Sequence, residues 1–342
     1  MSSAPLVSVL MSVYNGERYL REAMDSILCQ SLEDFEFIVI DDASTDGTAD
    51  ILAGYRDPRL VLARNRENLG LTRSLNRGLQ IAKGEFIARQ DADDISLPER
   101  LAVESAFLKE NPDTILVSSN IEYINSEGRR LGRSDRACPP ELVSWFLMFY
   151  NHVGGHSQVM FRRQEALGLS GYSESMRFSQ DHDLWLRMNK IGKIAILPDV
   201  LVRCRRHDQS ISKTARNEQE TLSIEASRRV IGELVGSEVD PKAVATLRRF
   251  WLGPFPSGES LGEVNESLKR IYRAFVRVPQ VCGLVSWQVR RDLRKAIARQ
   301  FIYWRYGFDR HREFGLKIRA SVCASSWHTA SLVGGPVERH HN

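Results

Sequence analysis

The sequence predicts an α/β fold in which a mostly parallel sheet is covered by helices on both faces, followed by a helical region. Two patterns lead to this prediction. Over residues 6–88, short apolar runs alternate with segments whose apolar residues recur at helical spacing, and this alternation is typical of a parallel sheet connected by helices. After about residue 215 the apolar runs fade into helix-like segments, which proline and glycine break at residues 253–256 and 278–279.

The first half of the chain supplies the strands and helices of that alternation. Strands are expected at residues 6–13, 35–40, 60–63 and 85–88, and helices at residues 19–28, 48–55 and 71–82. A further helix is expected to begin at Ser96, because Glu99 follows at the spacing of a capping box, and to end before Asn111-Pro112. Residues 114–119 then resume the sheet.

The second half is less regular. Residues 141–150 and 181–190 look helical, whereas residues 157–161, 194–197 and 201–204 look extended, so we expect a mixed arrangement there. A chain of 342 residues is long enough for one large domain and an appendage. We place the domain at residues 1–214, with halves at 1–100 and 101–214, and a helical, basic region at residues 215–342.

The composition favours a protein of a reducing compartment. The five cysteines are scattered and form no Cys-x-x-Cys pair, which argues against a disulfide framework and a structural zinc site. Residues 1–5 lack the pattern of a secretion signal, and the sequence has no run of about 18 apolar residues. We therefore expect a cytoplasmic protein without a membrane-spanning helix.

Positive charge is concentrated near the C-terminus. The net charge is only +4, yet residues 281–320 contain ten lysines and arginines against three acidic residues, a local excess of seven. Together with the apolar and aromatic residues 301–304, this segment suits an amphipathic helix on an anionic membrane. A lipid-linked diphosphate or nucleic acid would also fit the charge, and a solvated helix face is the simpler explanation. We expect peripheral membrane contact and no nucleic acid.

Three of the expected strands end in polar segments. The first leads into Ser12-Val13-Tyr14-Asn15-Gly16, the second into Asp41-Asp42-Ala43-Ser44-Thr45-Asp46-Gly47, and the fourth into Asp91-Ala92-Asp93-Asp94. Open parallel sheets bind ligands beyond the carboxyl ends of their strands, so these segments should line one crevice. Each segment alone has a plainer explanation as a turn or a helix cap.

The segment with three aspartates resists that explanation best. Three carboxylates within four residues repel one another unless a cation neutralises them. Mg²⁺ and Mn²⁺ prefer oxygen ligands and commonly bridge to phosphates, so a divalent metal and a diphosphate are the natural inference. Neither Gly-x-Gly-x-x-Gly nor Gly-x-x-x-x-Gly-Lys-Ser/Thr occurs near these strands, which argues against dinucleotide oxidoreductases and P-loop enzymes.

In order and spacing these segments resemble the family 2 glycosyltransferases, which have the GT-A fold. The donor part of the resemblance lies in residues 7–16, 41–48, 68–71 and 91–94. Residues 156–163, 180–187 and 205–207 look like the acceptor-side segments of bacterial members, so the resemblance covers about residues 5–212. It implies a GT-A, Rossmann-like domain that transfers a sugar from a nucleotide-diphosphate donor to an acceptor hydroxyl.

The resemblance implies five residues at the nucleotide-sugar donor. They are Ser12, Tyr14, Asp42, Arg73 and Asp91. Tyr14 would stack on the base and Asp42 would accept the ring N–H of the base, while Asp91 would hold the ribose side. A carboxylate that only accepts suits N3–H of uracil or thymine, and could also meet guanine. A UDP- or dTDP-sugar is therefore the favoured donor.

The resemblance also implies a divalent metal, Mg²⁺ or Mn²⁺. Asp93 would hold it, with Asp94 as a second candidate ligand and His207 approaching from the other side. The metal would draw charge off the departing diphosphate. A lone histidine is more often structural, and that alternative stays open for His207.

On the acceptor side, the resemblance implies that Asp181 is the catalytic base of an inverting displacement. It places His156, Gln180 and Asp183 on the same side. Similar members usually carry Glu-Asp where this chain has Gln180-Asp181. The role that the glutamate has in those members is therefore not assigned in this chain. Asp183 is the rival base, and Asp181 could instead be a capping residue at a helix start.

The expected acceptor is a surface polysaccharide or a lipid-linked saccharide. Two alternatives remain open. A metal-dependent nucleotidyltransferase also uses paired aspartates, but it gives no reason for the segments at residues 156 and 181, and it would release pyrophosphate. A non-catalytic nucleotide-sugar-binding protein would show no turnover with any donor.

Overall fold

The computed structural model describes residues 4–208, 215–252, 261–278 and 286–306. The chain divides into two compact units, Met1–Ser227 and Arg228–Asn342. Their boundary lies inside helix α9 (Arg216–Val235), whereas the sequence places a boundary between residues 214 and 215. Helix α9 begins directly after residue 215 and runs without interruption past the boundary between the units. The loss of the strand pattern after residue 215 therefore marks the start of this helix.

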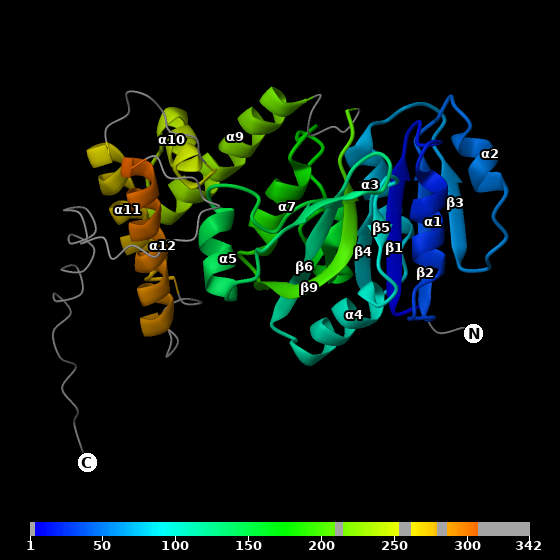
Figure 1. The fold of residues 1–342 in the computed structure, drawn as a ribbon, viewed down its shortest axis with the longest axis horizontal. Coiled ribbons are helices and arrows are strands. Elements are labelled where there is room, and N and C mark those ends of the chain that lie inside the picture. The colour runs from blue at the N-terminus through cyan, green and yellow to red at the C-terminus, as the bar shows by residue number, and fades with distance from the viewer. Residues whose placement is uncertain (1–3, 209–214, 253–260, 279–285, 307–342) are drawn as a thin grey trace, which may run out of the picture. The chain divides into compact units, whose positions relative to one another are not determined.

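The first unit contains one nine-stranded sheet, in the order β3-β2-β1-β4-β8-β6-β9-β5, with β7 paired to β6 (Figure 1). Its N-terminal strands are β1 (Val7–Val13), β2 (Phe35–Asp41), β3 (Leu60–Arg64) and β4 (Phe86–Gln90). They are connected by α1 (Leu20–Leu28), α2 (Thr48–Ala53) and α3 (Leu71–Ile81). All three pairings among these strands are parallel, so the predicted alternation is confirmed and the carboxyl ends of the strands share one edge.

The C-terminal part of the sheet is mixed. Its strands are β5 (Ile95–Ser96), β6 (Thr114–Ile124), β7 (Arg130–Arg133), β8 (Val159–Arg162) and β9 (Lys193–Arg205). Its helices are α4 (Arg100–Glu110), α5 (Pro140–Leu147), α6 (Arg163–Gly168) and α7 (Gln180–Met188), with a 3₁₀ turn at His156–Gln158. Strand β8 is antiparallel to β4 and β6, while β6 and β9 are parallel. The sheet as a whole is therefore parallel only in part.

The capping box predicted at Ser96 is wrong. Ser96 belongs to β5, where its backbone pairs with Val202, and its hydroxyl donates to Gln90 Oε1 at 2.7 Å. Helix α4 begins only at Arg100, and Glu99 accepts a hydrogen bond from the Ser31 hydroxyl at 2.9 Å. Both side chains of the predicted capping box are therefore bound to residues outside helix α4.

Helices α1 and α3 cover opposite faces of the sheet. The buried residues of α1 are Leu20, Ala23, Met24 and Ile27. They belong to the same core cluster as Val9 and Met11 of β1. Leu10 lies between these two residues and points to the other face, where a Cβ at Gly78 of α3 would collide with it. The close approach of α3 to the sheet therefore requires glycine at position 78.

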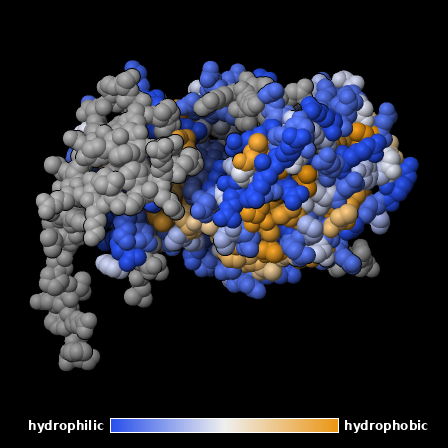
Figure 2. Space-filling model, in the orientation of Figure 1, coloured by the Kyte–Doolittle hydropathy of each residue, from blue (hydrophilic) through white to orange (hydrophobic). Residues whose placement is uncertain are grey.

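The face of the molecule drawn in Figure 2 is mostly hydrophilic, with several separate hydrophobic areas, one of them near α4. Among the described residues, the large hydrophobic side chains that are exposed are Tyr14, Leu62, Leu131, Ile191, Leu252 and Trp287. None of the helices in the described ranges is long and apolar enough to cross a bilayer.

The second unit contains α10 (Pro241–Leu252), α11 (Leu261–Phe275) and α12 (Ser286–Tyr306), which supplies the predicted helical region. The apolar residues Leu293, Ile297 and Phe301 of α12 are buried, and the Phe301 ring lies 4.9 Å from that of Phe250 in α10. This apolar stripe of α12 is therefore used within the unit. Residues 281–285 and 307–320 of the basic segment, and the side chains of 302–306, lie outside the described residues.

Candidate active site

The loops that follow β1 and β2 are bound to each other. The Asn15 side chain accepts a hydrogen bond from Thr45 N at 2.8 Å, and Asn15 N donates to the Ser44 hydroxyl at 3.0 Å. Asn15 and Ala43 both adopt left-handed backbone conformations, with φ of 53° and 61°, which is unusual for alanine. The two loops thus form one fixed rim, at which the Tyr14 side chain is 50% exposed and Ser12 is half-buried.

Asp42 anchors the loop before α3. Its carboxylate accepts hydrogen bonds from Leu69 N and Gly70 N, both at 2.9 Å, and from Asn65 Nδ2 at 2.5 Å. An ionised carboxylate offers about four acceptor positions, so three of them are occupied by the chain itself. Arg73, from the first turn of α3, has a side chain that is 59% exposed and pairs with Glu174 at 3.1 Å.

Asp91 is the first carboxylate beyond β4. Its Oδ1 accepts a hydrogen bond from Arg89 Nη2 at 2.9 Å and lies 3.7 Å from His156 Nδ1. Burial alone would raise the pKa of Asp91, but the charges of His156 and Arg89 lower this pKa to about 2. Asp91 is therefore held ionised.

Asp93 and Asp94 have different surroundings. Asp93 Oδ2 lies 2.8 Å from His207 Nε2, just beyond β9, and the Asp93 side chain is 33% exposed. Asp94 is buried, and its Oδ1 accepts a hydrogen bond from Arg205 N at 2.8 Å. Asp93 thus stays partly exposed beside His207, while Asp94 joins the aspartate loop to the end of β9.

Negative charge is crowded in the loop 91–94. Burial and the charge of Asp91 raise the pKa of Asp93, and burial together with the charges of Asp93 and Asp91 raises the pKa of Asp94 well above its ordinary value. Burial is the largest cause of both shifts, and repulsion between the neighbouring carboxylates adds to it. The ring of His207 is supported by Tyr19, whose centroid lies 5.2 Å away.

His156 lies between the aspartate loop and Tyr172. It is buried, and its ring packs edge-on against Tyr172 at 6.1 Å. Burial raises the pKa of the Tyr172 hydroxyl, and the charges of Asp181 and Asp91 add to this effect, while Arg89 opposes it. The charges of Asp181 and Asp91 therefore act on the same buried hydroxyl.

Asp181 lies in the first turn of α7 and is half-buried. Its Oδ2 accepts a hydrogen bond from Asn151 Nδ2 at 2.8 Å, and its Oδ1 accepts one from His182 N at 2.7 Å. The residue at the helix start is Ser179, in a left-handed conformation with φ of 55°. Asp181 is thus held by a side chain from the loop before β8.

Asp183 and Gln180 are both buried. Asp183 Oδ2 pairs with Arg187 Nε at 2.8 Å, and the same guanidinium donates to the carbonyl oxygens of Leu169 and Gly171. This pairing ties α7 to the turn after α6, which favours a structural role for Asp183 over that of rival base.

The sequence does not predict four residues that contact the site: Tyr19, Arg89, Gln90 and Asn151. Arg89 and Gln90 close an otherwise apolar strand, and two large polar residues at the end of a buried strand are a signal that points to a site. Tyr19 reads as an ordinary helix residue. Nothing in the sequence around Asn151 indicates that it meets Asp181.

The arrangement defines a class of protein. A parallel half-sheet that ends in an aspartate loop, completed by a mixed half that adds a histidine and helix α7, is the architecture of GT-A glycosyltransferases. The chain belongs to glycosyl transferase family 2, whose family model matches residues 8–185. It is therefore a glycosyltransferase.

Sequence relatives and solved structures agree with this assignment. The chain is 38% identical over 198 residues to the putative glycosyltransferase EpsE of Bacillus subtilis, covering 56% of this chain and 69% of the relative. It is 35% identical over 208 residues to the uncharacterized glycosyltransferase MJ1057 of Methanocaldococcus jannaschii, covering 59% and 71%. The S. aureus TarS 1–349 structure in complex with UDP-GlcNAc matches with a TM-score of 0.57 at 18% identity, over 92% of this chain and 97% of that one, which shows the shared fold.

Proposed function

We propose that this glycosyltransferase moves a sugar from a UDP- or dTDP-sugar to an acceptor hydroxyl with inversion, with Mg²⁺ or Mn²⁺ at Asp93 and His207 and Asp181 as the base. The observation that carries the proposal is the 2.8 Å pairing of Asp93 Oδ2 with His207 Nε2. This pairing closes the crowded aspartate loop against the end of β9 and offers one oxygen and one nitrogen ligand at the same point.

The residues fit a divalent metal that is shared with the donor. Among the described residues, no group of three or more His, Cys, Asp or Glu side chains is arranged to hold a metal ion alone. Mg²⁺ usually binds through one or two protein carboxylates, with substrate phosphates and water completing the shell, so a site completed by the donor diphosphate is consistent with two protein ligands. Asp93 is the better candidate than Asp94, because Asp94 is buried and bound by Arg205 N.

The chain's own residues then account for the transfer. Asp181 takes the proton of the acceptor hydroxyl, whose oxygen attacks the anomeric carbon while the bond to the diphosphate oxygen breaks and the nucleoside diphosphate leaves. The hydrogen bond from Asn151 orients Asp181, and base catalysis of this kind contributes about 10²–10⁴-fold. A bound metal would stabilise the negative charge of the leaving diphosphate.

Donor recognition rests on the rim formed by the loops after β1 and β2. The exposed ring of Tyr14 is available to stack on the base, and the remaining acceptor position of Asp42 would receive the base's N–H. Asp91, held ionised, would accept from the ribose hydroxyls. Arg73 stays a candidate ligand of the donor phosphates. Its ion pair with Glu174 lies at the surface, so replacing that pair by a contact with phosphate costs little free energy.

For the acceptor we propose a surface polysaccharide or a lipid-linked saccharide, with the enzyme held peripherally at an anionic membrane. The exposed basic residues Lys295 and Arg299 of α12 support this location. Because Leu293, Ile297 and Phe301 are buried within the second unit, contact would be electrostatic and would not involve insertion of that stripe.

The test is product analysis with UDP-, dTDP- and GDP-sugars in the presence of Mn²⁺. Release of the nucleoside diphosphate, with a product of inverted anomeric configuration, is the expected result. Release of pyrophosphate would identify a nucleotidyltransferase, and binding without turnover of any donor would identify a nucleotide-sugar-binding protein.

A further inference from the structure

Gln90 connects the sheet to the aspartate loop 91–94. It is the last residue of β4 and fully buried. Its Nε2 donates to the carbonyl oxygen of Asp91 at 3.1 Å and to that of Asp94 at 2.8 Å. One amide group thus binds both ends of the loop, and Asp93 lies between the two bound positions.

The orientation of this amide is fixed from behind. Gln90 Oε1 accepts hydrogen bonds from the Ser96 hydroxyl at 2.7 Å and from Arg100 Nη1 at 3.2 Å. Because Arg100 can only donate, the amide cannot rotate by 180° without placing its NH₂ group against the guanidinium. The Nε2 hydrogens must therefore face the two loop carbonyls.

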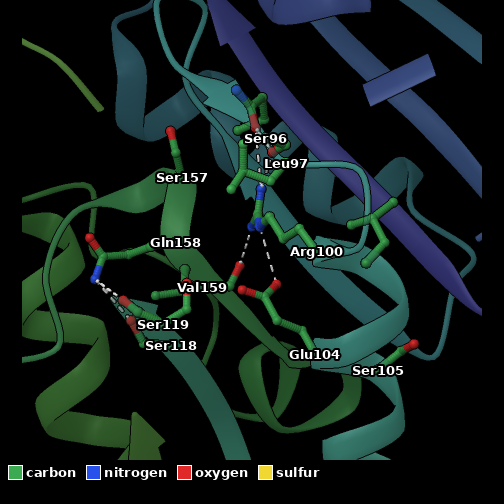
Figure 3. Close-up of polar contacts among 12 residues, drawn as sticks. Ser96, Leu97, Arg100, Glu104, Ser105, Ser118, Ser119, Ser157, Gln158 and Val159 are labelled. Carbon is green, nitrogen blue, oxygen red and sulfur yellow. Dashed lines mark hydrogen bonds and ion pairs between the residues drawn. The ribbon is translucent and has the colours of Figure 1, made fainter. Parts of the chain in front are cut away.

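Arg100 is itself held on three sides, as Figure 3 shows. Beyond Gln90 and Ser96, its Nη2 donates to the carbonyl oxygen of Val159 at 3.1 Å and its Nε donates to Glu104 Oε2 at 3.2 Å. Arg100 and Glu104 are both fully buried. The clamp on the loop therefore rests on α4 and β8, which lie in the packed core.

We infer that Gln90 is a positioning residue, which holds the loop 91–94 in the shape that brings Asp93 to His207. The inference rests on the proposed metal role of these two residues. The loop needs such a clamp because its carboxylates repel one another, and Gln90 binds the backbone on both sides of the residue that must face the metal. Groups that orient metal ligands typically contribute 10–100-fold to metal affinity.

The experiment compares two variants of the same buried network. Gln90→Met keeps the length of the side chain and removes both donors to the loop. Glu104→Gln is the matched control, because Glu104 is equally buried and contacts Arg100 but not the loop. Calorimetry measures Mn²⁺ binding to the full-length protein with saturating UDP, at a temperature where circular dichroism shows each variant to be folded.

The expected result is a rise of about 10-fold or more in the Mn²⁺ dissociation constant of Gln90→Met, with Glu104→Gln within about twofold of wild type. If Gln90→Met does not fold, Gln90→Glu replaces it, since it keeps the acceptor for Arg100 and lacks the paired N–H donors. Wild-type Mn²⁺ affinity in the folded Gln90 variant, or an equal loss in Glu104→Gln, would overturn the inference. A wild-type protein that binds no Mn²⁺ in the presence of UDP would instead refute the proposed metal site, and the inference with it.

Discussion

Replacing Asp181 by asparagine separates its role as a base from its role in holding α7. Asparagine keeps one oxygen for the His182 N–H, but its NH₂ group would meet the Asn151 NH₂ group that now donates to Asp181 Oδ2. The loss of one hydrogen bond costs about 1 kcal/mol in the free energy of unfolding. Removal of the proton acceptor should lower the transfer rate by about 10² or more.

Asp183→Asn is the matched control. Compared with Asp181→Asn, it should affect stability more and sugar transfer less. It removes the carboxylate that pairs with Arg187, whose side chain is only 20% exposed. Breaking a buried pair by removing one partner costs about 3–5 kcal/mol, and the carbonyl oxygens that still bind Arg187 place this case near the lower end. Asp183→Asn should therefore lower the melting temperature more than Asp181→Asn does, and reduce transfer by the folded enzyme less.

The assay is release of nucleoside diphosphate at saturating donor and acceptor, together with UDP affinity by calorimetry and thermal unfolding by circular dichroism. Asp181→Asn should keep UDP affinity and most of its stability. Transfer at near wild-type rate would show that Asp181 is not the base, and Asp183 would then be the candidate base. Unfolding, or loss of UDP binding, would show that Asp181 is structural or belongs to the donor side.

Three further predictions concern other parts of the chain. Tyr14→Ala should raise the UDP dissociation constant about 10-fold, because base stacking contributes about 1–3 kcal/mol, while Tyr14→Phe should bind like wild type in the same titration. Burial raises the pKa of Glu104 from 4.5 to about 7, so the folded state keeps a proton that the unfolded chain has lost. The free energy of unfolding should thus fall by up to about 3 kcal/mol as the pH rises from about 4.5 to 7, and urea unfolding of Glu104→Gln should show a flatter pH profile. Lys295→Glu/Arg299→Glu should sediment less than wild type with anionic liposomes at low salt, and equal wild-type binding to neutral liposomes would count against a membrane role.

The donor half of the fold could be predicted because its rules are local. Apolar runs mark β1, β2 and β4, and parallel strands bring their carboxyl ends to one edge. The sequence therefore predicts Tyr14, Asp42 and the aspartate loop at the same edge of the sheet. The start of α4 could not be predicted, because Ser96 and Glu99 are engaged by Gln90 and Ser31, which lie outside the helix and form no capping pattern.

Which residue of the site has which role also depends on long-range contacts. Asp93 and Asp94 are neighbours with the same side chain, and only the approach of β9 distinguishes them, since Arg205 N binds one and His207 faces the other. Likewise, Asn151 meets Asp181 across 30 residues of sequence. The sequence therefore identifies the chemical groups, and the packing of β9 and α7 determines which of them stay partly exposed and which are buried.

The position of Mn²⁺ in crystals grown with UDP tests the central claim most directly. Anomalous scattering locates the ion independently of any assumption about its ligands. A peak about 2.0–2.2 Å from both Asp93 Oδ2 and His207 Nε2, in contact with the diphosphate, is the predicted result. A peak coordinated by Asp94 in place of Asp93, or no peak in crystals that contain UDP, would contradict the proposed site.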